Sequence, residues 1–430
     1  MAQINVNNLT FAYDGSFDTV FENVSFQIDT DWKIGLIGRN GRGKTTLLHL
    51  LMGKYPYRGT ITRSALFDYF PYSVSDDLPD TLAVLETVTD APTWQIQREI
   101  SYLDVPEEAL HRSFHTLSSG EQTKVLLAAL FLNEDRFLLI DEPTNHLDAQ
   151  ARQTVGAYLR RKKGFILVSH DRTLLDQCVD HVLAINKTNI EIQKGNFTSW
   201  KENKERQDSF QYSENEKLKR QIRDLSDAQK RTARWADQTE KSKFSSQKSG
   251  LSPDRGYIGH KAAKMMKRSK AAEARMEKAI AEKSSLLKNI ETAEDLKLYP
   301  LTHHRNCLAY VRALSISYGN YPVCSDVNFE IHVGERVALQ GKNGSGKSSI
   351  MKLLLGMEIP FTGEVHMESG LHVSYVPQST ESVQGNMKTF IQRNNIDETL
   401  FKAILRKLDF ARYHFEKELD CLSAGQKKKF

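Results

Sequence analysis

The stretch IGLIGRNGRGKTTLL, residues 34–48, decides the fold class of this chain. Within it, Gly38 to Thr45 satisfies the spacing G-x4-G-K-[ST], between an apolar segment and the apolar run TLLHLLM. This order predicts a strand, a tight loop and a helix, in which backbone N–H groups wrap around phosphates. Lys44 is then expected to reach the β- and γ-phosphates, and the Thr45 hydroxyl to ligate magnesium. The predicted nucleotide-binding residues of this loop are Gly38, Arg39, Asn40, Gly41, Arg42, Gly43, Lys44, Thr45 and Thr46.

The same stretch recurs as VALQGKNGSGKSSIM at 337–351, an offset of 303 residues. LSSGEQ at 117–122 is echoed by LSAGQK at 422–427, and LTFAYDG at 9–15 by LSISYGN at 314–320. Three pairs of similar segments, each separated by almost the same number of residues, predict two copies of one domain. The predicted nucleotide-binding residues of the second loop are Gly341, Lys342, Asn343, Gly344, Ser345, Gly346, Lys347, Ser348 and Ser349.

Each copy has the pattern of an α/β domain with a mostly parallel sheet. Short apolar segments at Ile34–Ile37, Phe137–Ile140 and Phe165–Val168 alternate with glycine turns and helical stretches. We expect these segments to be strands with helices packed on them. In the second copy, RVALQ at 336–340 is the corresponding strand before the loop.

Two carboxylates follow a buried strand of the first copy. FLLIDE at 137–142 predicts that Asp141 holds the magnesium shell and that Glu142 polarises a water for in-line attack on the γ-phosphate. VSHD at 168–171 repeats the layout and places His170 at a strand end. His170 is predicted to contact the γ-phosphate; the alternative is a satisfied structural histidine.

The composition indicates a globular protein of two or three domains. The 430 residues are 40% hydrophobic and 26% charged, no apolar run approaches the roughly 20 residues that cross a bilayer, and the first residues, MAQINVNNL, lack the pattern of a secretory signal. The cysteines contain no CxxC pair, which argues against a zinc site or a disulfide framework and fits a reducing cytoplasm. They are Cys178, Cys307, Cys324 and Cys421.

A basic segment separates the two copies. Residues 201–300 hold 24 Lys/Arg against 16 Asp/Glu, and 241–270 alone hold 9 against 1. Apolar residues at helical spacing flank the turn-forming stretch 245–259, so we expect an antiparallel helical hairpin with a basic tip near 241–265. Such a tip fits a nucleic-acid backbone, although a solvated charged helical pair is the alternative. Groups that could stack on bases are Phe244, Tyr257, Met265 and Met266.

At this point a family resemblance is clear. LSSGEQ is the signature of ATP-binding cassette (ABC) domains, and HLD at 146–148 and SHD at 169–171 complete the pattern. Two cassettes without membrane segments, joined by a charged helical linker, resemble the ABC-F ATPases, of which LIDEPTNHLDAQAR at 139–152 is typical. DRGYIGHKAAKMMKRSK at 254–270 is most similar to the Lsa/Vga-type antibiotic-resistance proteins.

The resemblance implies a domain organisation and two composite ATP sites. The expected fold is α/β, with two ABC-type domains of the P-loop NTPase fold at 1–199 and 301–430 and a helical hairpin linker at 200–300. The cassettes are expected to close head to tail within one chain, so that each phosphate loop faces the signature of the other. The signature residues are Ser118, Ser119, Gly120 and Glu121, and Ser423, Ala424, Gly425 and Gln426.

The same resemblance implies the remaining ligands. Gln378 belongs to the second site, and Tyr13 and Tyr318 stand where the family places an aromatic ring against adenine, although each could equally be a half-buried strand residue. The implied cofactors are ATP and Mg2+. The expected magnesium ligands are Thr45, Asp141, Ser348 and Gln378.

Two features depart from the family pattern. The sequence ends at Phe430, whereas the repeat offset puts the second glutamate near 447 and the second histidine near 475. We therefore interpret the chain as the first part of a protein of about 500 residues, with a natural truncation as the alternative, and expect an exposed apolar sheet edge in the second copy. In addition, Tyr72 stands where the second copy has Gln378, and a phenol is a poorer magnesium ligand than an amide oxygen.

The implied function is that of a ribosome-protection ATPase in the cytoplasm. Its partners are large-subunit rRNA and tRNA near the peptidyl-transferase region, contacted through linker 241–270. The drugs implied are lincosamides, pleuromutilins and streptogramin A compounds. Alternatives are a housekeeping translation factor that relieves stalled ribosomes and, less in keeping with the basic linker, the ATPase subunit of a transporter.

Overall fold

A computed structural model of the chain divides into two compact units, one formed by Met1–Thr198 with Ala293–Phe430 and the other by Ser199–Thr292. The two copies of the repeat lie in the first unit. The residues that the structure describes are 3–13, 19–39, 41–72, 74, 78–133, 135–145, 147–186, 189–210, 212–214, 216–217, 220, 223, 260, 263–264, 267, 270, 301, 303–319, 321–377, 383–408, 410, 415, 418–422 and 424–429.

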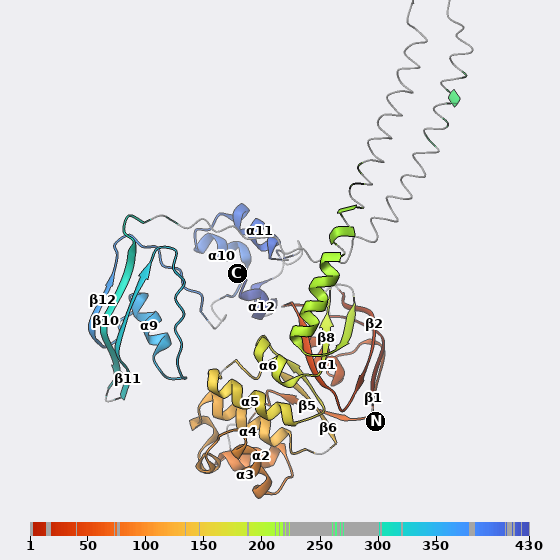
Figure 1. The fold of residues 1–430 in the computed structure, drawn as a ribbon, viewed down its shortest axis with the longest axis horizontal. Coiled ribbons are helices and arrows are strands. Elements are labelled where there is room, and N and C mark those ends of the chain that lie inside the picture. The colour runs from red at the N-terminus through yellow and green to blue at the C-terminus, as the bar shows by residue number, and fades with distance from the viewer. Residues whose placement is uncertain are drawn as a thin grey trace, which may run out of the picture. The chain divides into compact units, whose positions relative to one another are not determined.

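The first copy is built around a six-stranded sheet (Figure 1). Its strands are parallel except for the last pair, β8 and β9. The predicted strands at 34–37, 137–140 and 165–168 all lie in this sheet and are confirmed. In spatial order the strands are β5 (Leu66–Phe70), β6 (Arg136–Asp141), β7 (Phe165–Val168), β3 (Lys33–Gly38), β8 (His181–Ile185) and β9 (Ile190–Lys194).

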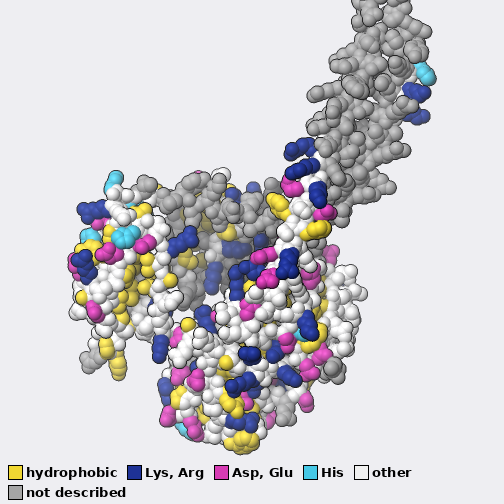
Figure 2. Space-filling view, viewed as in Figure 1, with side chains coloured by type: hydrophobic (Ala, Val, Ile, Leu, Met, Phe, Trp, Pro, Cys, Tyr) yellow, Lys and Arg dark blue, Asp and Glu magenta, His cyan; other side chains and the backbone are white. Residues whose placement is uncertain are grey.

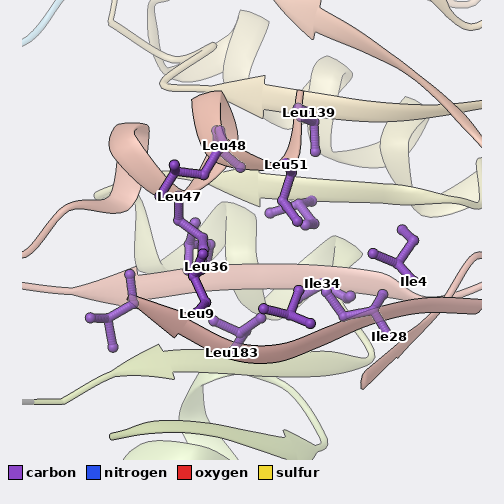
Figure 3. Packing of buried hydrophobic residues seen from close by; sticks show 14 of the residues in the cluster. Ile4, Leu9, Ile28, Ile34, Leu36, Leu47, Leu48, Leu51, Leu139 and Leu183 are labelled. Atoms are coloured by element: carbon purple, nitrogen blue, oxygen red, sulfur yellow. The ribbon is translucent and has the colours of Figure 1, made fainter. Parts of the chain in front are cut away.

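A second, antiparallel sheet packs against this one. It consists of β1 (Gln3–Ala12) between β2 (Thr19–Asp29) and β4 (Arg58–Arg63). Ile4, Leu9 and Ile28 from this sheet meet Leu36 and other apolar residues of the central sheet and of helix α1 (Lys44–Leu51) in one fully buried cluster (Figure 3). This packing holds helix α1, and with it the phosphate loop that precedes α1, in place against the two sheets.

The other helices of the first copy cover the sheet and form a helical lobe. A buried polar contact joins two of these helices: Tyr158 Oη donates a 2.6 Å hydrogen bond to Glu99 Oε2, and Lys162 Nζ pairs with the same oxygen. Because a buried carboxylate needs such partners, this contact fixes α3 against α5. The helices are α2 (Thr81–Val88), α3 (Thr93–Ser101), α4 (Ser119–Leu130), α5 (Ala149–Arg161) and α6 (Arg172–Cys178), with 3-10 turns η1 (Glu107–His111) and η2 (Phe114–Thr116).

The second copy repeats the first half of this architecture. Strand β10 (Cys307–Tyr318) lies between β11 (Tyr321–His332) and β12 (Phe361–Met367), as β1 lies between β2 and β4. Helix α9 (Lys347–Leu354) follows the second loop as α1 follows the first. The remaining described elements are α10 (Met387–Arg393), α11 (Glu398–Lys407), η6 (Leu419–Cys421) and α12 (Ala424–Lys427).

The predicted strand at 336–340 is wrong, because these residues form no strand. Its counterpart β3 is hydrogen-bonded to β7 and β8, whereas residues 336–340 pair with no strand among the described residues. A strand without neighbours has no partner for its backbone groups. The described part of the second copy therefore has apolar side chains exposed outside any strand, rather than the expected sheet edge. They include Val337, Val373, Tyr375 and Val376.

Only the beginning of the linker and a few later residues are described. A helix starts at residue 197 and continues through 210, and the described residues between 212 and 270 are helical too. The predicted turn at 245–259 and the residues Phe244, Tyr257, Met265 and Met266 lie outside the described residues. Among the described helices, none has the length and hydropathy that a membrane crossing requires.

Candidate functional site

The first phosphate loop lies between β3 and α1, as its motif predicts. Gly41 and Gly43 have φ angles of 83° and 87°, a region that favours glycine, and Gly43 is the N-cap of α1. A Cβ on Gly43 would lie 2.6 Å from Val20 Cγ1, so both the backbone and the space require glycine there. The loop thereby directs the N-terminus of a helix, with its free N–H groups, at the place where phosphates are expected.

Lys44 folds back over its own loop in this structure. Its Nζ donates to the carbonyl oxygen of Gly38 at 2.8 Å and lies 3.5 Å from that of Arg39. Burial lowers the pKa of Lys44, while the carboxylates of Glu142 and Asp141 oppose that shift. The ammonium group is therefore held inside the loop, next to the two acids.

The expected magnesium ligands of the first copy lie together. Thr45 Oγ1 donates a 2.6 Å hydrogen bond to Asp141 Oδ2, across 96 residues of sequence. Tyr69, on the neighbouring strand β5, donates to the same oxygen at 3.3 Å. Hydroxyl and carboxylate oxygens are ligands that suit Mg2+, so Thr45 and Asp141 fit this ion. Tyr69 was not predicted, and only the pairing of β5 with β6 reveals it.

Tyr72 does not take part in this contact. Its side chain is exposed, whereas Tyr69 donates a hydrogen bond to Asp141. Gln378, its counterpart in the second copy, lies outside the described residues, as does Asn40 of the first loop.

Glu142 and His170 are neighbours at the ends of β6 and β7. His170 Nε2 lies 3.3 Å from Glu142 Oε1, which is buried and has no hydrogen-bond partner among the described residues. Burial, and then the negative charge of Asp141, raises the pKa of Glu142 to about 7. Burial, and then the charge of Lys44, lowers the pKa of His170. A carboxyl group poised near neutral pH beside a neutral imidazole is suited to proton transfer.

The backbone of Glu142 is strained. Its φ is 50°, in the left-handed region that non-glycine residues rarely adopt, while its N–H donates to the carbonyl of Val168 at 2.9 Å. Such strain concentrates at functional sites, where the surrounding structure holds it.

The two tyrosines expected near adenine occupy equivalent positions. Tyr13 Oη is 2.6 Å from Thr46 Oγ1, and Tyr318 Oη donates to Ser349 Oγ at 3.1 Å. The two side chains are 43% and 46% exposed. Each ring is thus tethered to the residue two positions after the loop lysine and partly open to a base. Tyr318 is the last residue of β10 and Tyr13 directly follows β1, so both positions also fit the alternative of a half-buried strand residue.

The second phosphate loop repeats the first in detail. Gly344 and Gly346 have φ angles of 79° and 83°, and Gly346 caps α9. Lys347 Nζ donates to the carbonyl oxygens of Gly341 at 2.9 Å and Lys342 at 2.7 Å. Among the described residues, this loop geometry therefore occurs in both copies.

Comparison with known proteins decides the family. The family model described as ABC transporter matches residues 21–145 and 324–430, which together are more than half of the chain. The chain belongs to the ABC transporter family. Its α/β domains are therefore ATP-binding cassettes, and the predicted fold class is confirmed.

Several ABC relatives cover most of the chain. The ribosome protection protein VmlR of Bacillus subtilis is 28% identical over 97% of this chain and 74% of its own length. The erythromycin resistance ATP-binding protein MsrA of Staphylococcus epidermidis is 27% identical over 92% of this chain and 79% of its own. ABC transporter F family member 2 of Arabidopsis thaliana is 24% identical over 99% and 67%. These relatives confirm the predicted resemblance to ABC-F ATPases.

The first ABC signature begins a helix. Ser118 is the N-cap of α4; its Oγ accepts from the Glu121 N–H at 3.3 Å, and Glu121 Oε2 accepts from the Ser118 N–H at 2.8 Å. This reciprocal capping fixes the position of Ser119 and Gly120 at the helix start. In the second signature, Ala424 to Gln426 lie in α12, and Ser423 is outside the described residues.

Proposed function

We propose that this chain is an ATP hydrolase of the ABC-F type that binds the ribosome and protects it from antibiotics acting on the large subunit. The observation that carries the proposal is the pairing of Glu142 with His170 beside Lys44, within a chain similar over almost its whole length to a ribosome protection protein.

The proposed chemistry takes place at the first phosphate loop. Lys44 releases its own loop carbonyls and binds the β- and γ-phosphates, and Glu142 accepts a proton from the attacking water. His170 contacts the γ-phosphate and holds the carboxylate in place. A Mg2+ held by Thr45 and Asp141 would supply positive charge against the phosphates. Tyr13 and Tyr318 stack on adenine at the two loops.

The proposed partner is the large ribosomal subunit with its tRNA. The excess of positive charge in 241–270 favours contact with a phosphate backbone. ATP binding closes the two cassettes head to tail, each loop against the signature of the other, with Ser348 and Gln378 as magnesium ligands of the second site. Closure of the cassettes inserts the linker into the ribosome, and hydrolysis of ATP releases the protein from it. These steps take place in the cytoplasm. The drugs proposed are lincosamides, pleuromutilins and streptogramin A compounds.

Drug susceptibility tests this proposal directly. The chain is expressed in a susceptible bacterium, and minimal inhibitory concentrations are measured for the three drug classes, with an empty vector, with Glu142→Gln and with Glu22→Gln, an exposed glutamate on β2. We expect at least one drug class to be tolerated at several-fold higher concentration with the wild type and with Glu22→Gln, and protection to be lost with Glu142→Gln. Unchanged susceptibility in all strains would exclude the resistance function.

Ribosome binding separates the remaining alternatives. Glu142→Gln protein should sediment with ribosomes in ATP, and binding should weaken steeply as salt rises. Ribosome binding without any change in drug susceptibility favours the housekeeping factor. No ribosome binding at low salt excludes both and leaves the transporter subunit.

A further inference from the structure

A group of metal-binding side chains lies at the open end of the β10–β11 hairpin, outside the nucleotide site. Cys307 is the first residue of β10 and His332 the last of β11, and the two are paired in register. Glu330, two residues before His332, points to the same side of the strand as His332. The ligand atoms of Cys307, Glu330 and His332 all lie within 4.8 Å of one another.

The register of the sheet explains how Cys307 joins this group. A register shift follows Cys307, so that Ala309 pairs with Ile331 although Cys307 pairs with His332. Ala309 is buried in the sheet, whereas Cys307 is only partly buried. The shift therefore brings the thiol to the side of the hairpin that carries Glu330 and His332. Figure 2 shows histidine, acidic and basic side chains gathered over the part of the molecule that carries β10 to β12.

The ring nitrogen Nε2 of His332 faces the carboxylate of Glu330. The two atoms, His332 Nε2 and Glu330 Oε2, lie 3.5 Å apart. The spacing of 3.5 Å is also the distance expected between two ligand atoms of one tetrahedral zinc ion, roughly 3.3–3.8 Å from bond lengths of about 2.0–2.3 Å.

We propose that Cys307, Glu330 and His332 bind one divalent cation of the zinc class, with a fourth position for water. Thiolate and imidazole ligands select such an ion over magnesium, and a carboxylate completes the set. Arg312 lies 3.9 Å from Glu330, but both side chains are half exposed, so this ion pair is weak and can be given up. The proposal does not depend on the function proposed above.

The bound ion would hold the two open ends of the hairpin together. β10 and β11 are joined at the Tyr318–Tyr321 end, so Cys307 and His332 lie at the opposite end, where the chain enters and leaves the hairpin. Beyond them, one backbone hydrogen bond, from Val333 N to Asn306 O at 2.8 Å, continues the pairing. A ligand that binds only the folded state stabilises it, and this site requires the two strand ends to be together.

Titration with Co2+, a spectroscopic substitute for zinc, tests the site. Untagged full-length protein is stripped of metal and titrated without nucleotide or magnesium. We expect one Co2+ per chain with a thiolate-to-cobalt charge-transfer band that Zn2+ abolishes. Cys307→Ser should lose the band, and His332→Ala and Glu330→Gln should each weaken binding at least about tenfold, since even indirect partners of a ligand contribute 10–100-fold.

Cys324→Ser is the matched control, because Cys324 is a thiol on the same strand pair outside the group. It should retain the charge-transfer band and the stoichiometry. Zn2+ should also raise the melting temperature of the wild type and of Cys324→Ser, but not that of Cys307→Ser, whose conservative change at a partly exposed strand end preserves the fold. A wild type without stoichiometric Co2+ binding, or a Cys307→Ser variant that keeps the band, would overturn the proposal.

Discussion

The ring Nε2 of His170 lies 3.3 Å from Oε1 of Glu142, although 28 residues separate them along the chain. The contact exists because β6 and β7 are adjacent parallel strands, so the residues that follow them meet at one edge of the sheet. Lys44 reaches the same edge from β3, on the other side of β7. Three side chains from three loops thus form one candidate site for ATP hydrolysis.

Replacing Glu142 by Gln should abolish most ATP hydrolysis while preserving ATP binding. The amide keeps the shape of the side chain but cannot accept a proton, and general-base catalysis typically contributes about 10²–10⁴-fold. Phosphate release measured on purified protein should fall by that factor, with binding of a fluorescent ATP analogue unchanged. Glu22→Gln serves as control, and retention of the wild-type rate by Glu142→Gln would refute the assigned role.

Glu142 should make stability depend on pH in the nucleotide-free protein. Its folded-state pKa of about 7 lies above the ordinary 4.5, so its stabilising contribution is complete below about pH 4.5 and is lost as the pH rises through 7. Glu142→Gln should therefore melt at the wild-type temperature near pH 4.5 and about 2–4 °C higher at pH 8, a gain of about 1 kcal/mol after discounting for solvent screening. An identical difference at both pH values would contradict the raised pKa.

Tyr69→Phe should increase the magnesium concentration needed for half-maximal hydrolysis by about fivefold. The change removes one of two hydroxyl groups that orient Asp141, and a hydrogen bond of this kind contributes about 1 kcal/mol. Tyr72→Gln is the companion variant, since Tyr72 is exposed. If Tyr72→Gln changed the magnesium dependence and Tyr69→Phe did not, the sequence-based role of Tyr72 would be right and that of Tyr69 wrong.

Gly43→Ala should destabilise the first copy more than Gly344→Ala destabilises the second. Both positions have a positive φ, which costs about 1–2 kcal/mol for a residue with a Cβ. At Gly43 the new carbon also meets Val20 at 2.6 Å, whereas a Cβ added at Gly344 would have no described atom within 4 Å apart from its chain neighbours. Thermal melting of both variants measures the difference, and equal losses would show that the collision is relieved by movement of Val20.

The sequence alone determined both phosphate loops, the α/β class and the acids at the end of β6. These features are encoded by short stretches of sequence. Glycines at a fixed spacing allow only a few backbone paths for the phosphate loop. An apolar segment that ends in Asp-Glu is buried along the strand and exposed at its last residues. Because the two copies have matching sequences, a prediction made for a residue of one copy also applied to its counterpart in the other. That is why the paired contacts Tyr13–Thr46 and Tyr318–Ser349 lie at residues that the sequence had already marked.

Tertiary structure decided what depends on strand neighbours. Residues 336–340 have a strand-forming sequence but form no strand, because hydrogen bonding requires partners that local sequence does not provide. Tyr69 joins Asp141 because β5 lies beside β6, and a register shift brings Cys307 to Glu330 and His332. The spacing of the cysteines argues against a zinc site, but spacing along the chain contains no information on side chains that only strand pairing brings together, and the proposed site depends on that pairing.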